Sequence, residues 1–313
     1  MNRPAADSGT GRRGFASALF SRIWASPYVP LLLAVLFWSG NFIVGRAVAE
    51  SVPPIGLAFW RWILALLLVL GLGWRHIAKD LPALKASWPM LLVLGVLGVS
   101  TFNTFVYYGL HTTTALNALL LQSAMPIVIL ALTFLLFGER PRIAQAVGVV
   151  VSLAGVATIA SSGDWSALAS LTFNSGDLWV LGAVGSYALY SVLLRKRPSV
   201  HPLSFLAAIF ALGSLVLVPF YVAEHLMLGP MQPTLETFLA LIYVAVFPGF
   251  LSYLFFNRGV ELAGANTAGH FIHLIPIFGS VLAMLLLGER LAVFHVVGGL
   301  LIACGLVLAT RGR

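Results

Sequence analysis

The sequence contains few charged residues. Only 9% of its 313 residues are charged, and the 10 acidic residues are outnumbered by 18 lysines and arginines. Hydrophobic residues make up 60% of the chain, and the mean hydropathy is +0.98. A soluble domain of this composition would present far more apolar surface than water tolerates, whereas a lipid bilayer requires such a surface. The composition therefore predicts an integral membrane protein.

Cysteine and mid-membrane carboxylates are scarce as well. The single cysteine, Cys304, falls in the last apolar run, which excludes a disulfide framework or a thiolate metal site. All ten acidic residues fall in polar segments or at the ends of apolar runs. Proton- and sodium-coupled antiporters and exporters of cationic drugs commonly use a buried carboxylate. The sequence therefore argues against tight coupling and cationic drug export, and we expect neither a cofactor nor a metal.

What the sequence does contain is a series of long apolar runs separated by short polar breaks. Each run has about 20 residues, the length of a helix that crosses a hydrocarbon core about 30 Å thick. The predicted fold is an all-α membrane protein. Its ten transmembrane helices are predicted near residues 29–49, 56–74, 88–110, 115–137, 142–161, 177–194, 203–224, 236–257, 266–287 and 292–310.

The chain also repeats itself at an offset of 150 residues. Pro126-Ile127 recurs as Pro276-Ile277, and Gly138-Glu139-Arg140 recurs as Gly288-Glu289-Arg290. Each half then holds five helices, and because five is odd the second half must enter the membrane upside down, as in many secondary transporters. The predicted units are a basic tail (1–28), the first repeat (29–161), an outer connecting loop (162–176), the second repeat (177–310) and a cytoplasmic end (311–313).

The basic residues give an orientation to these helices. With the amino terminus inside, 15 of the 18 fall in inner segments and Arg290 falls in an outer loop. Arg46 and Arg61 lie in spans near their outer ends, where we expect their long side chains to snorkel to the headgroups. Both termini are therefore predicted to be cytoplasmic, and the positive charge is explained without a nucleic-acid partner.

The amino-terminal tail has two interpretations. Its basic, increasingly amphipathic sequence is typical of an interfacial helix or a disordered segment. A signal peptide cleaved after Ala47-Val48-Ala49 is the alternative, but cleavage would leave nine spans and break the repeat.

Two helices carry small residues that permit close packing. Ala144, Gly148 and Ser152 are spaced by four in the fifth helix, and the tenth helix contains Gly298, Gly299 and Gly305. We expect these two helices to pack against each other; dimerisation through the same faces is the alternative, so a monomer and a homodimer both stay open. Each Gly-Glu-Arg is interpreted as a tight hairpin.

Six of the predicted helices carry polar or aromatic residues at mid-membrane depth, which lipid does not tolerate. We predict that these side chains face a shared cavity suited to a small neutral or zwitterionic solute with an apolar body. Interhelical packing or hydrogen bonding is the alternative for each, and the two histidines are the most ambiguous. The candidate substrate-binding residues are Trp38, Asn41, Asn103, Tyr107, Gln122, Tyr187, Tyr190, Tyr253, His270 and His273.

Three prolines within predicted spans free backbone carbonyls one turn upstream. Pro126 and Pro276 occupy matched positions in the repeat, and Pro248 precedes Gly249 in the eighth helix. We interpret them as sites of helix bending that gate the cavity; shape-filling in a packed bundle is the alternative.

These features resemble a known family. The two five-helix halves, the Trp38-Ser39-Gly40-Asn41 stretch and the Gly-Glu-Arg hairpins are similar to the EamA-type members of the drug/metabolite transporter superfamily, most of all to bacterial amino-acid exporters of the YddG type. The resemblance implies an inner-membrane exporter whose central cavity is lined by helices 1, 3, 4, 6, 8 and 9.

The sequence thus predicts a transporter, not an enzyme, that exports or equilibrates aromatic or neutral amino acids and similar small metabolites by alternating access. Because no carboxylate lies at mid-membrane depth, we expect a facilitator or a loosely coupled carrier. A sugar-nucleotide, phosphate-ester or cationic-drug exporter of the same superfamily is one alternative. A membrane-embedded enzyme acting on lipids is the alternative from another class.

Overall fold

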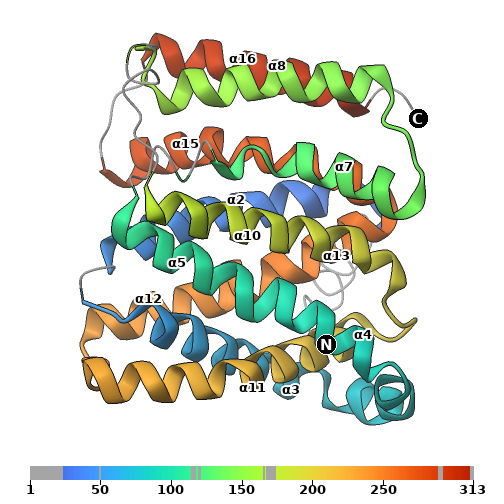
Figure 1. Ribbon diagram of the computed structural model, residues 1–313, viewed down its shortest axis with the longest axis vertical. Helices are drawn as coiled ribbons and strands as arrows, with labels where there is room; N and C mark the ends of the chain where they lie inside the picture. Colours follow the sequence, from blue (N-terminus) through green and yellow to red (C-terminus); the bar gives the residue numbers. More distant parts are fainter. Residues whose placement is uncertain are drawn as a thin grey trace, which may run out of the picture.

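The computed structural model describes residues 24–48, 51–113, 118, 121–164, 166, 174–287 and 292–310, and the regular secondary structure in them is helical throughout (Figure 1). The predicted tail as far as residue 23, the second Gly-Glu-Arg hairpin, most of the outer connecting loop and residues 311–313 lie outside the described residues.

The first half contains helices α2 (Val29–Ala47), α3 (Pro54–Ala86), α4 (Trp88–Gly95), η1 (Val96–Thr101), α5 (Phe102–Thr112), α7 (Met125–Phe137) and α8 (Ile143–Ala160). The second half contains α10 (Ser175–Leu193), η2 (Leu194–Lys196), α11 (Pro202–Leu228), α12 (Leu235–Val244), η3 (Ala245–Leu251), α13 (Ser252–Ala263), α14 (Ala265–Phe271), η4 (Ile272–Leu274), α15 (Ile275–Leu287) and α16 (Val293–Thr310).

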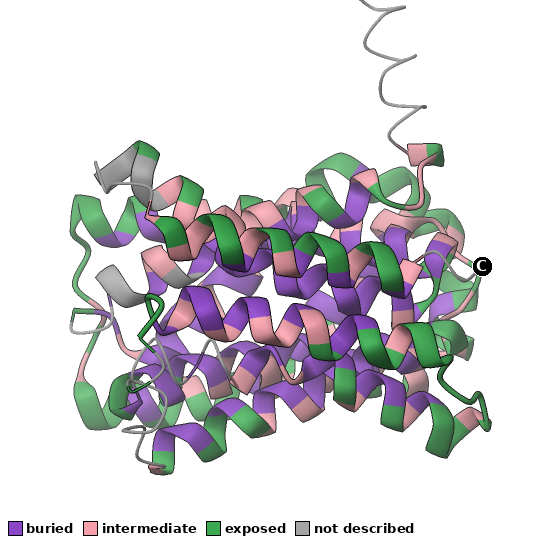
Figure 2. Cartoon of the chain, turned by 90° about the horizontal axis from the view of Figure 1, so that it is seen from above, coloured by how far each residue is buried: buried purple, intermediate pink, exposed green. Residues whose placement is uncertain are grey.

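Length and hydropathy make seven of the described helical stretches candidates for crossing a membrane, and shorter apolar helices lie at Val29–Gly45 and Met125–Phe137. Figure 2 shows buried residues toward the middle of the bundle and exposed residues on the outward faces of its helices. Those outward faces carry large apolar side chains such as Leu72, Leu135 and Val150, which are more than half exposed. Lipid is the solvent that such a surface needs, so the membrane-protein prediction is confirmed.

The internal repeat is visible in the helices themselves. The bounds of α15 follow those of α7 by 150 residues at both ends, and the same offset relates α16 to α8. The third helical stretch of the first half widens into a π-helix at η1, and its counterpart in the second half does so at η3. Pro248 lies in η3, whereas η1 contains no proline, so the π-geometry belongs to the repeated architecture and does not depend on that residue.

Helices α8 and α16 lie side by side at one edge of the bundle (Figure 1). A Cβ atom added at Gly148 would lie 2.5 Å from the carbonyl oxygen of Gly305, and one added at Gly155 would lie 2.6 Å from that of Gly298. Only glycine permits this approach of the two backbones. The predicted pairing is confirmed, and the small-residue faces are filled within one chain, which leaves the alternative of dimerisation through these faces without support.

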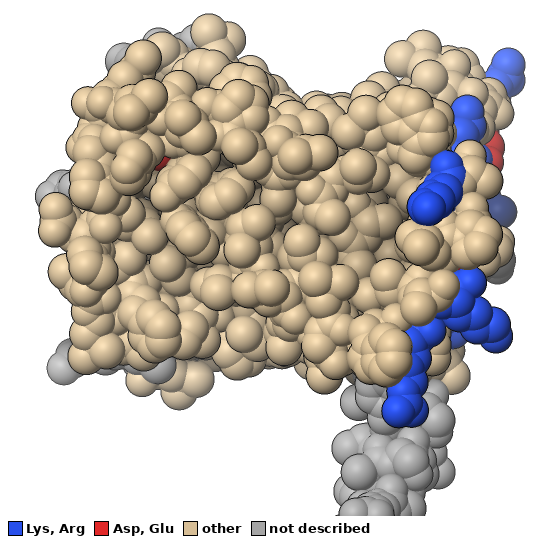
Figure 3. Space-filling model, turned by 90° about the horizontal axis from the view of Figure 1, so that it is seen from below, with Lys and Arg blue, Asp and Glu red and all other residues tan. Residues whose placement is uncertain are grey.

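Lysine and arginine side chains gather at one end of the molecule (Figure 3). Polar contacts join the predicted inner segments there: Asp80 accepts a hydrogen bond from the backbone of His201 at 2.9 Å, and Arg195 forms an ion pair with Glu139 at 2.7 Å. We call this end the basic end. It brings together segments that the charge pattern had assigned to one side of the membrane.

Buried acids at the opposite end hold helix termini. Glu224 of α11 accepts hydrogen bonds from the backbone N–H groups of Ile55 (3.0 Å) and Gly56 (2.6 Å) in the first turn of α3. Asp177 of α10 accepts one from the hydroxyl of Thr113. A carboxylate at a helix N-terminus satisfies free N–H groups and complements the helix dipole. These acids are structural.

Some helices extend beyond their predicted ends. The second span was predicted at 56–74, but α3 continues to Ala86 through a polar segment that includes Pro82. The apolar run ends where the bilayer ends, whereas a helix ends only where its backbone is interrupted, in this case at Ser87. Hydropathy therefore located the membrane boundary but not the end of the helix.

Candidate functional site

A small cavity lies near the centre of the bundle. Its lining side chains come from α2, α5, α10, the start of α7 with the segment that leads into it, η4 and the start of α15, and its volume is about 20 Å³. A single water molecule needs about 10–15 Å³ measured in this way, so the cavity in this conformation is too small for a metabolite. The lining residues are Trp38, Asn41, Phe102, Asn103, Val106, Gln122, Met125, Tyr187, Ile272 and Ile275.

Half of the predicted site residues line this cavity: Trp38, Asn41, Asn103, Gln122 and Tyr187. Tyr107 stands behind Asn41 and donates a hydrogen bond to its Oδ1 at 3.2 Å. Tyr190 and Tyr253 back the wall formed by Tyr187, with ring centroids 5.1 Å and 5.9 Å from it. Sequence reasoning missed the five apolar lining residues, because an apolar side chain in a membrane span carries no signal of which way it faces.

An aromatic wall forms one side of the cavity. The Trp38 indole meets Tyr187 edge to face, with centroids 5.5 Å apart, and Phe256 lies 5.0 Å from Trp38 and 5.5 Å from Tyr187. The indole Nε1 donates to the carbonyl oxygen of Pro248 in η3 at 3.1 Å. Because α2, α10 and α13 each contribute rings, a movement between these helices changes the shape of the wall.

Several polar atoms at the cavity have no hydrogen-bond partner. They are Nδ2 of Asn103, Nε2 of Gln122 and the hydroxyl of Tyr187, all on residues less than a tenth exposed. An unsatisfied buried donor costs about 1–3 kcal/mol. Each of these three groups can donate to a ligand that occupies the cavity, and a ligand would recover that cost.

The prediction that Arg61 snorkels to the headgroups is wrong. Its side chain was expected to snorkel toward the headgroups, but it is fully buried. Nη1 donates to Oδ1 of Asn41 at 3.0 Å and to the hydroxyl of Tyr107 at 2.9 Å. Snorkelling requires a side chain that faces lipid, whereas Arg61, like its fully buried neighbour Trp62, lies on the inward face of α3. A cationic side chain therefore stands directly behind a residue that lines the cavity.

The two predicted histidines do not line the cavity. His273 Nε2 donates to the carbonyl oxygen of Ser123 at 2.7 Å, and its Nδ1 meets the hydroxyl of Ser152 on α8. His270 is buried without a hydrogen-bond partner for either ring nitrogen. The contacts of His273 match the alternative interpretation, in which a histidine joins helices by hydrogen bonds.

Interrupted helices adjoin the cavity. Gln122 precedes a turn at residues 123–124, after which Pro126 stands in the first turn of α7. In the second half, the 3-10 turn η4 precedes α15, and Ser39 of α2 donates to the carbonyl oxygen of Ile275 there at 3.2 Å. Irregular backbone at membrane depth is tolerated where it lines a cavity, and it is common at transporter sites.

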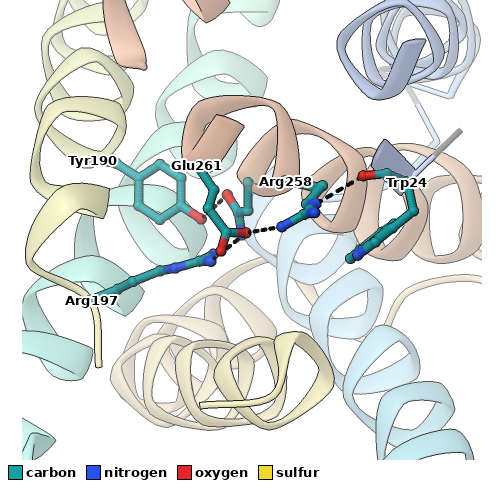
Figure 4. A network of polar contacts seen from close by, with 6 residues as sticks. Trp24, Tyr190, Arg197, Arg258 and Glu261 are labelled. Atoms are coloured by element: carbon teal, nitrogen blue, oxygen red, sulfur yellow. Dashed lines mark hydrogen bonds and ion pairs between the residues drawn. The ribbon is translucent and has the colours of Figure 1, made fainter. Parts of the chain in front are cut away.

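A larger hollow of about 780 Å³ opens at the basic end; we call it the vestibule. Charged side chains line it, among them Arg195, Arg197 and Glu261. Glu261 forms ion pairs with Arg197 and Arg258, each at 2.9 Å, and Arg258 also donates to the carbonyl oxygen of Trp24 at 3.0 Å (Figure 4). The segment after α10 is thereby tied to α13.

A hydrogen bond lies between the wall of the central cavity and the vestibule. Tyr190, fully buried beside Tyr187, donates from its hydroxyl to Oδ1 of Asn257 at 2.8 Å, and Asn257 itself lines the vestibule. Figure 4 shows the Tyr190 ring pointing into the same polar group as Arg197 and Glu261. We call the Tyr190–Asn257 pair the inner contact. To connect cavity and vestibule along this line, the inner contact has to separate.

At the basic end, outside the spans, Glu139 follows α7 and accepts hydrogen bonds from both terminal nitrogens of Arg195, at 2.7 and 3.2 Å. These bonds, reinforced by the positive charge of the guanidinium, hold the pKa of Glu139 below its usual value. Both side chains are more than a third exposed, so solvent screens the pair.

Comparisons with known proteins agree with this architecture. The model of the EamA-like transporter family matches the chain twice, at residues 26–161 and 174–311. An uncharacterized transporter of Archaeoglobus fulgidus is 32% identical over 284 residues, which cover 90% of this chain and 96% of the relative. The uncharacterized transporter YyaM of Bacillus subtilis is 25% identical over 288 residues, covering 90% and 93%. A solved crystal structure shares the fold with a TM-score of 0.75 at 20% identity, covering 91% of this chain and 96% of that one.

Proposed function

The chain belongs to the EamA-like transporter family, and on that premise we propose that it carries aromatic or neutral amino acids and similar small metabolites by alternating access through the central cavity. The central cavity is the main support for this function. Helices of both halves enclose it, it combines an aromatic wall with unpartnered hydrogen-bond donors, and broken helices surround it. Such a site suits a small solute with an apolar body and a polar head.

In the proposed topology, ten helices cross the membrane in two inverted repeats, residues 29–161 and 177–310, and the basic end faces the cytoplasm of a bacterial inner membrane. This orientation follows the excess of lysine and arginine in cytoplasmic loops. The two halves exchange conformations so that the cavity opens first at the basic end and then at the opposite end.

The mode of transport follows from where the acids lie. Glu224 and Asp177 are engaged at helix termini, and Glu139 and Glu261 form ion pairs at the basic end. A carboxylate that trades protons against substrate must reach both of its protonation states during the cycle. These four are committed to structural contacts, which supports a facilitator or a loosely coupled carrier.

The test is uptake of labelled amino acids into proteoliposomes, with and without an imposed pH gradient. We expect saturable uptake of at least one aromatic or neutral amino acid without the gradient. Gln122→Ala and Tyr187→Ala should each reduce it about tenfold or more, since each removes a donor worth about 1.4 kcal/mol or more to the bound solute. Gln232→Ala, at an exposed position, and Tyr108→Ala, on the bundle surface, are the matched controls. Unchanged uptake in both cavity variants would contradict the site assignment.

A phosphate-ester carrier of the same superfamily is the second candidate, because Arg61 is cationic and buried beside the cavity. A dianionic group is normally held by two or more cationic side chains. The same proteoliposomes therefore include a labelled sugar phosphate, and its saturable uptake in place of amino acids would favour this candidate.

A further inference from the structure

Arg61 is a buried cation without an anionic partner in the described part of the chain. Its guanidinium contacts the neutral groups of Asn41 and Tyr107 and lies 4.8 Å from the centroid of the Trp62 ring, and its Nε has no hydrogen-bond partner. The ion pairs that the described residues form involve Arg195, Arg197 and Arg258 instead. Arg61 is also fully buried, so neither bulk water nor lipid headgroups reach the charge.

Such an arrangement is costly. Removing a charge from water is costly, and hydrogen bonds to neutral groups and contact with an aromatic ring recover less of that cost than a well-placed counter-charge does. If the role of Arg61 were only to join α2, α3 and α5, a neutral hydrogen-bonding side chain would do so without that penalty. A retained charge at this depth points to a ligand that supplies the opposite charge during the working cycle.

The charge lies within reach of the cavity. Asn41 lines the cavity, and its Oδ1 is the atom that receives both the Arg61 and the Tyr107 hydrogen bonds. An acceptor group that took the place of this oxygen would contact Nη1 of Arg61 directly. The step requires only that the Asn41 side chain turn as the cavity widens, and the cavity must widen in any case to admit a solute.

The other polar groups of the cavity favour the same kind of ligand. Asn103, Gln122 and Tyr187 present unpartnered donors, so the cavity has a surplus of hydrogen-bond donors next to a positive charge. A carboxylate is the matching group: it carries one negative charge, has two acceptor oxygens, and forms charge-assisted hydrogen bonds about twice as strong as neutral ones. One cation matches a monoanionic group better than a dianionic phosphate.

We propose that the substrate carries a carboxylate and that Arg61 binds this group in the central cavity when the Asn41 side chain turns away from the guanidinium. This inference rests on the proposed transport function and names the chemical group that the site selects. The aromatic wall of Trp38 and Tyr187 then receives the apolar body, so that the carboxylate sets the orientation of the solute.

The test compares each acid with its amide on the wild-type protein. In proteoliposomes, unlabelled phenylalanine and phenylalaninamide, and 3-phenylpropanoate and its amide, compete with the best labelled substrate. Each amide should compete about 10- to 100-fold less well than its acid, because a charge-assisted hydrogen bond contributes about 1.5–3 kcal/mol. Equal competition by acid and amide would overturn the inference while leaving transport itself established.

A binding measurement keeps the test independent of transport. The thermal stability of the purified protein is followed with the same four compounds, and stabilisation by the acids but not by the amides is expected. If no labelled compound is taken up but the acids alone stabilise the protein, the proposed transport of amino acids fails and the carboxylate site stands. If no acid stabilises the protein more than its amide, the carboxylate site fails.

Variants then assign the effect to Arg61. Arg61→Gln should abolish the preference for acid over amide, and Arg61→Lys should retain part of it, since the charge remains. Tyr107→Phe removes a neighbouring hydrogen bond but keeps the charge, so it should retain the preference. Arg75→Gln, at an exposed position on the same helix, is the matched control. A folded Arg61→Gln protein with an undiminished preference would contradict the assignment.

Discussion

Separation of the inner contact is the step that should open the cavity toward the basic end. Tyr190 and Asn257 are 0% and 4% exposed, and their hydrogen bond measures 2.8 Å. Tyr190→Phe removes the hydroxyl that donates to Oδ1 of Asn257. Nδ2 of Asn257 has no hydrogen-bond partner in the wild-type protein either. Loss of such a bond costs the closed conformation about 1–2 kcal/mol, which corresponds to a factor of about 5–30 in a two-state equilibrium.

The assay follows a cysteine placed in the cavity. Val106 lines the cavity and Cys304 is the single native cysteine, so Val106→Cys combined with Cys304→Ser creates one reporter thiol. A membrane-impermeant thiol reagent is added from the basic end. While the open state is the minor one, the labelling rate is proportional to its population, so Tyr190→Phe should raise the rate about 5- to 30-fold.

A double-mutant cycle isolates the contact. Tyr190→Phe and Asn257→Ala should each raise labelling, and together they should raise it by less than the product of the two effects, with a coupling energy of about 1 kcal/mol. Tyr221→Phe is the control, because its hydroxyl accepts a hydrogen bond from Trp60 away from the cavity. Unchanged labelling in Tyr190→Phe, or fully multiplicative effects in the double variant, would refute a gating role for this pair.

Three further predictions concern residues outside the cavity. Glu224→Gln should destabilise the folded protein by about 1–3 kcal/mol, because one carboxylate accepts hydrogen bonds from two N–H groups of α3. Thermal unfolding measures this loss, with the exposed Glu236→Gln as control, and an equal effect of both substitutions would contradict it. His273→Ala should also lower thermal stability but leave KM for transport within about twofold, since His273 joins helices; a raised KM at unchanged stability would place it in the site instead. Glu139 has a lowered pKa in the folded state, so its contribution to folding stability is present above its unfolded pKa of about 4.3 and is lost as pH falls through the folded value. Glu139→Gln should therefore lower stability at pH 7 by at most about 1 kcal/mol and have no effect in acid. A larger loss of stability in acid than at pH 7 would contradict this prediction.

The sequence alone predicted those features that depend on periodicity and small residues. The offset of 150 residues located the matched helices. The glycines of α8 and α16 identified their pairing, because a Cβ atom at these positions would collide with the facing backbone. Polar residues at membrane depth identified Trp38, Asn41, Asn103, Gln122 and Tyr187, because lipid excludes such groups and their helices must turn them inward.

The rest depended on directions that a sequence does not encode. Arg61 is the eighth residue of α3, close enough to the end of the apolar run to be predicted as snorkelling, and only the packing of α3 against its neighbours shows that it points inward. His273 lies at membrane depth as the cavity residues do, but its ring faces α8. Phe102 and Ile275 line the cavity but are apolar, as are the residues that face lipid, so the sequence does not distinguish them.

In the proposed transport cycle, one cavity opens alternately to both sides of the membrane. The reporter Val106→Cys with Cys304→Ser is therefore treated with the impermeant thiol reagent in membrane vesicles of both orientations. We predict labelling from each face, with a substrate such as phenylalanine or 3-phenylpropanoate slowing both reactions. Labelling from one face alone, with the thiol of the folded protein unreactive from the other, would contradict alternating access through this cavity.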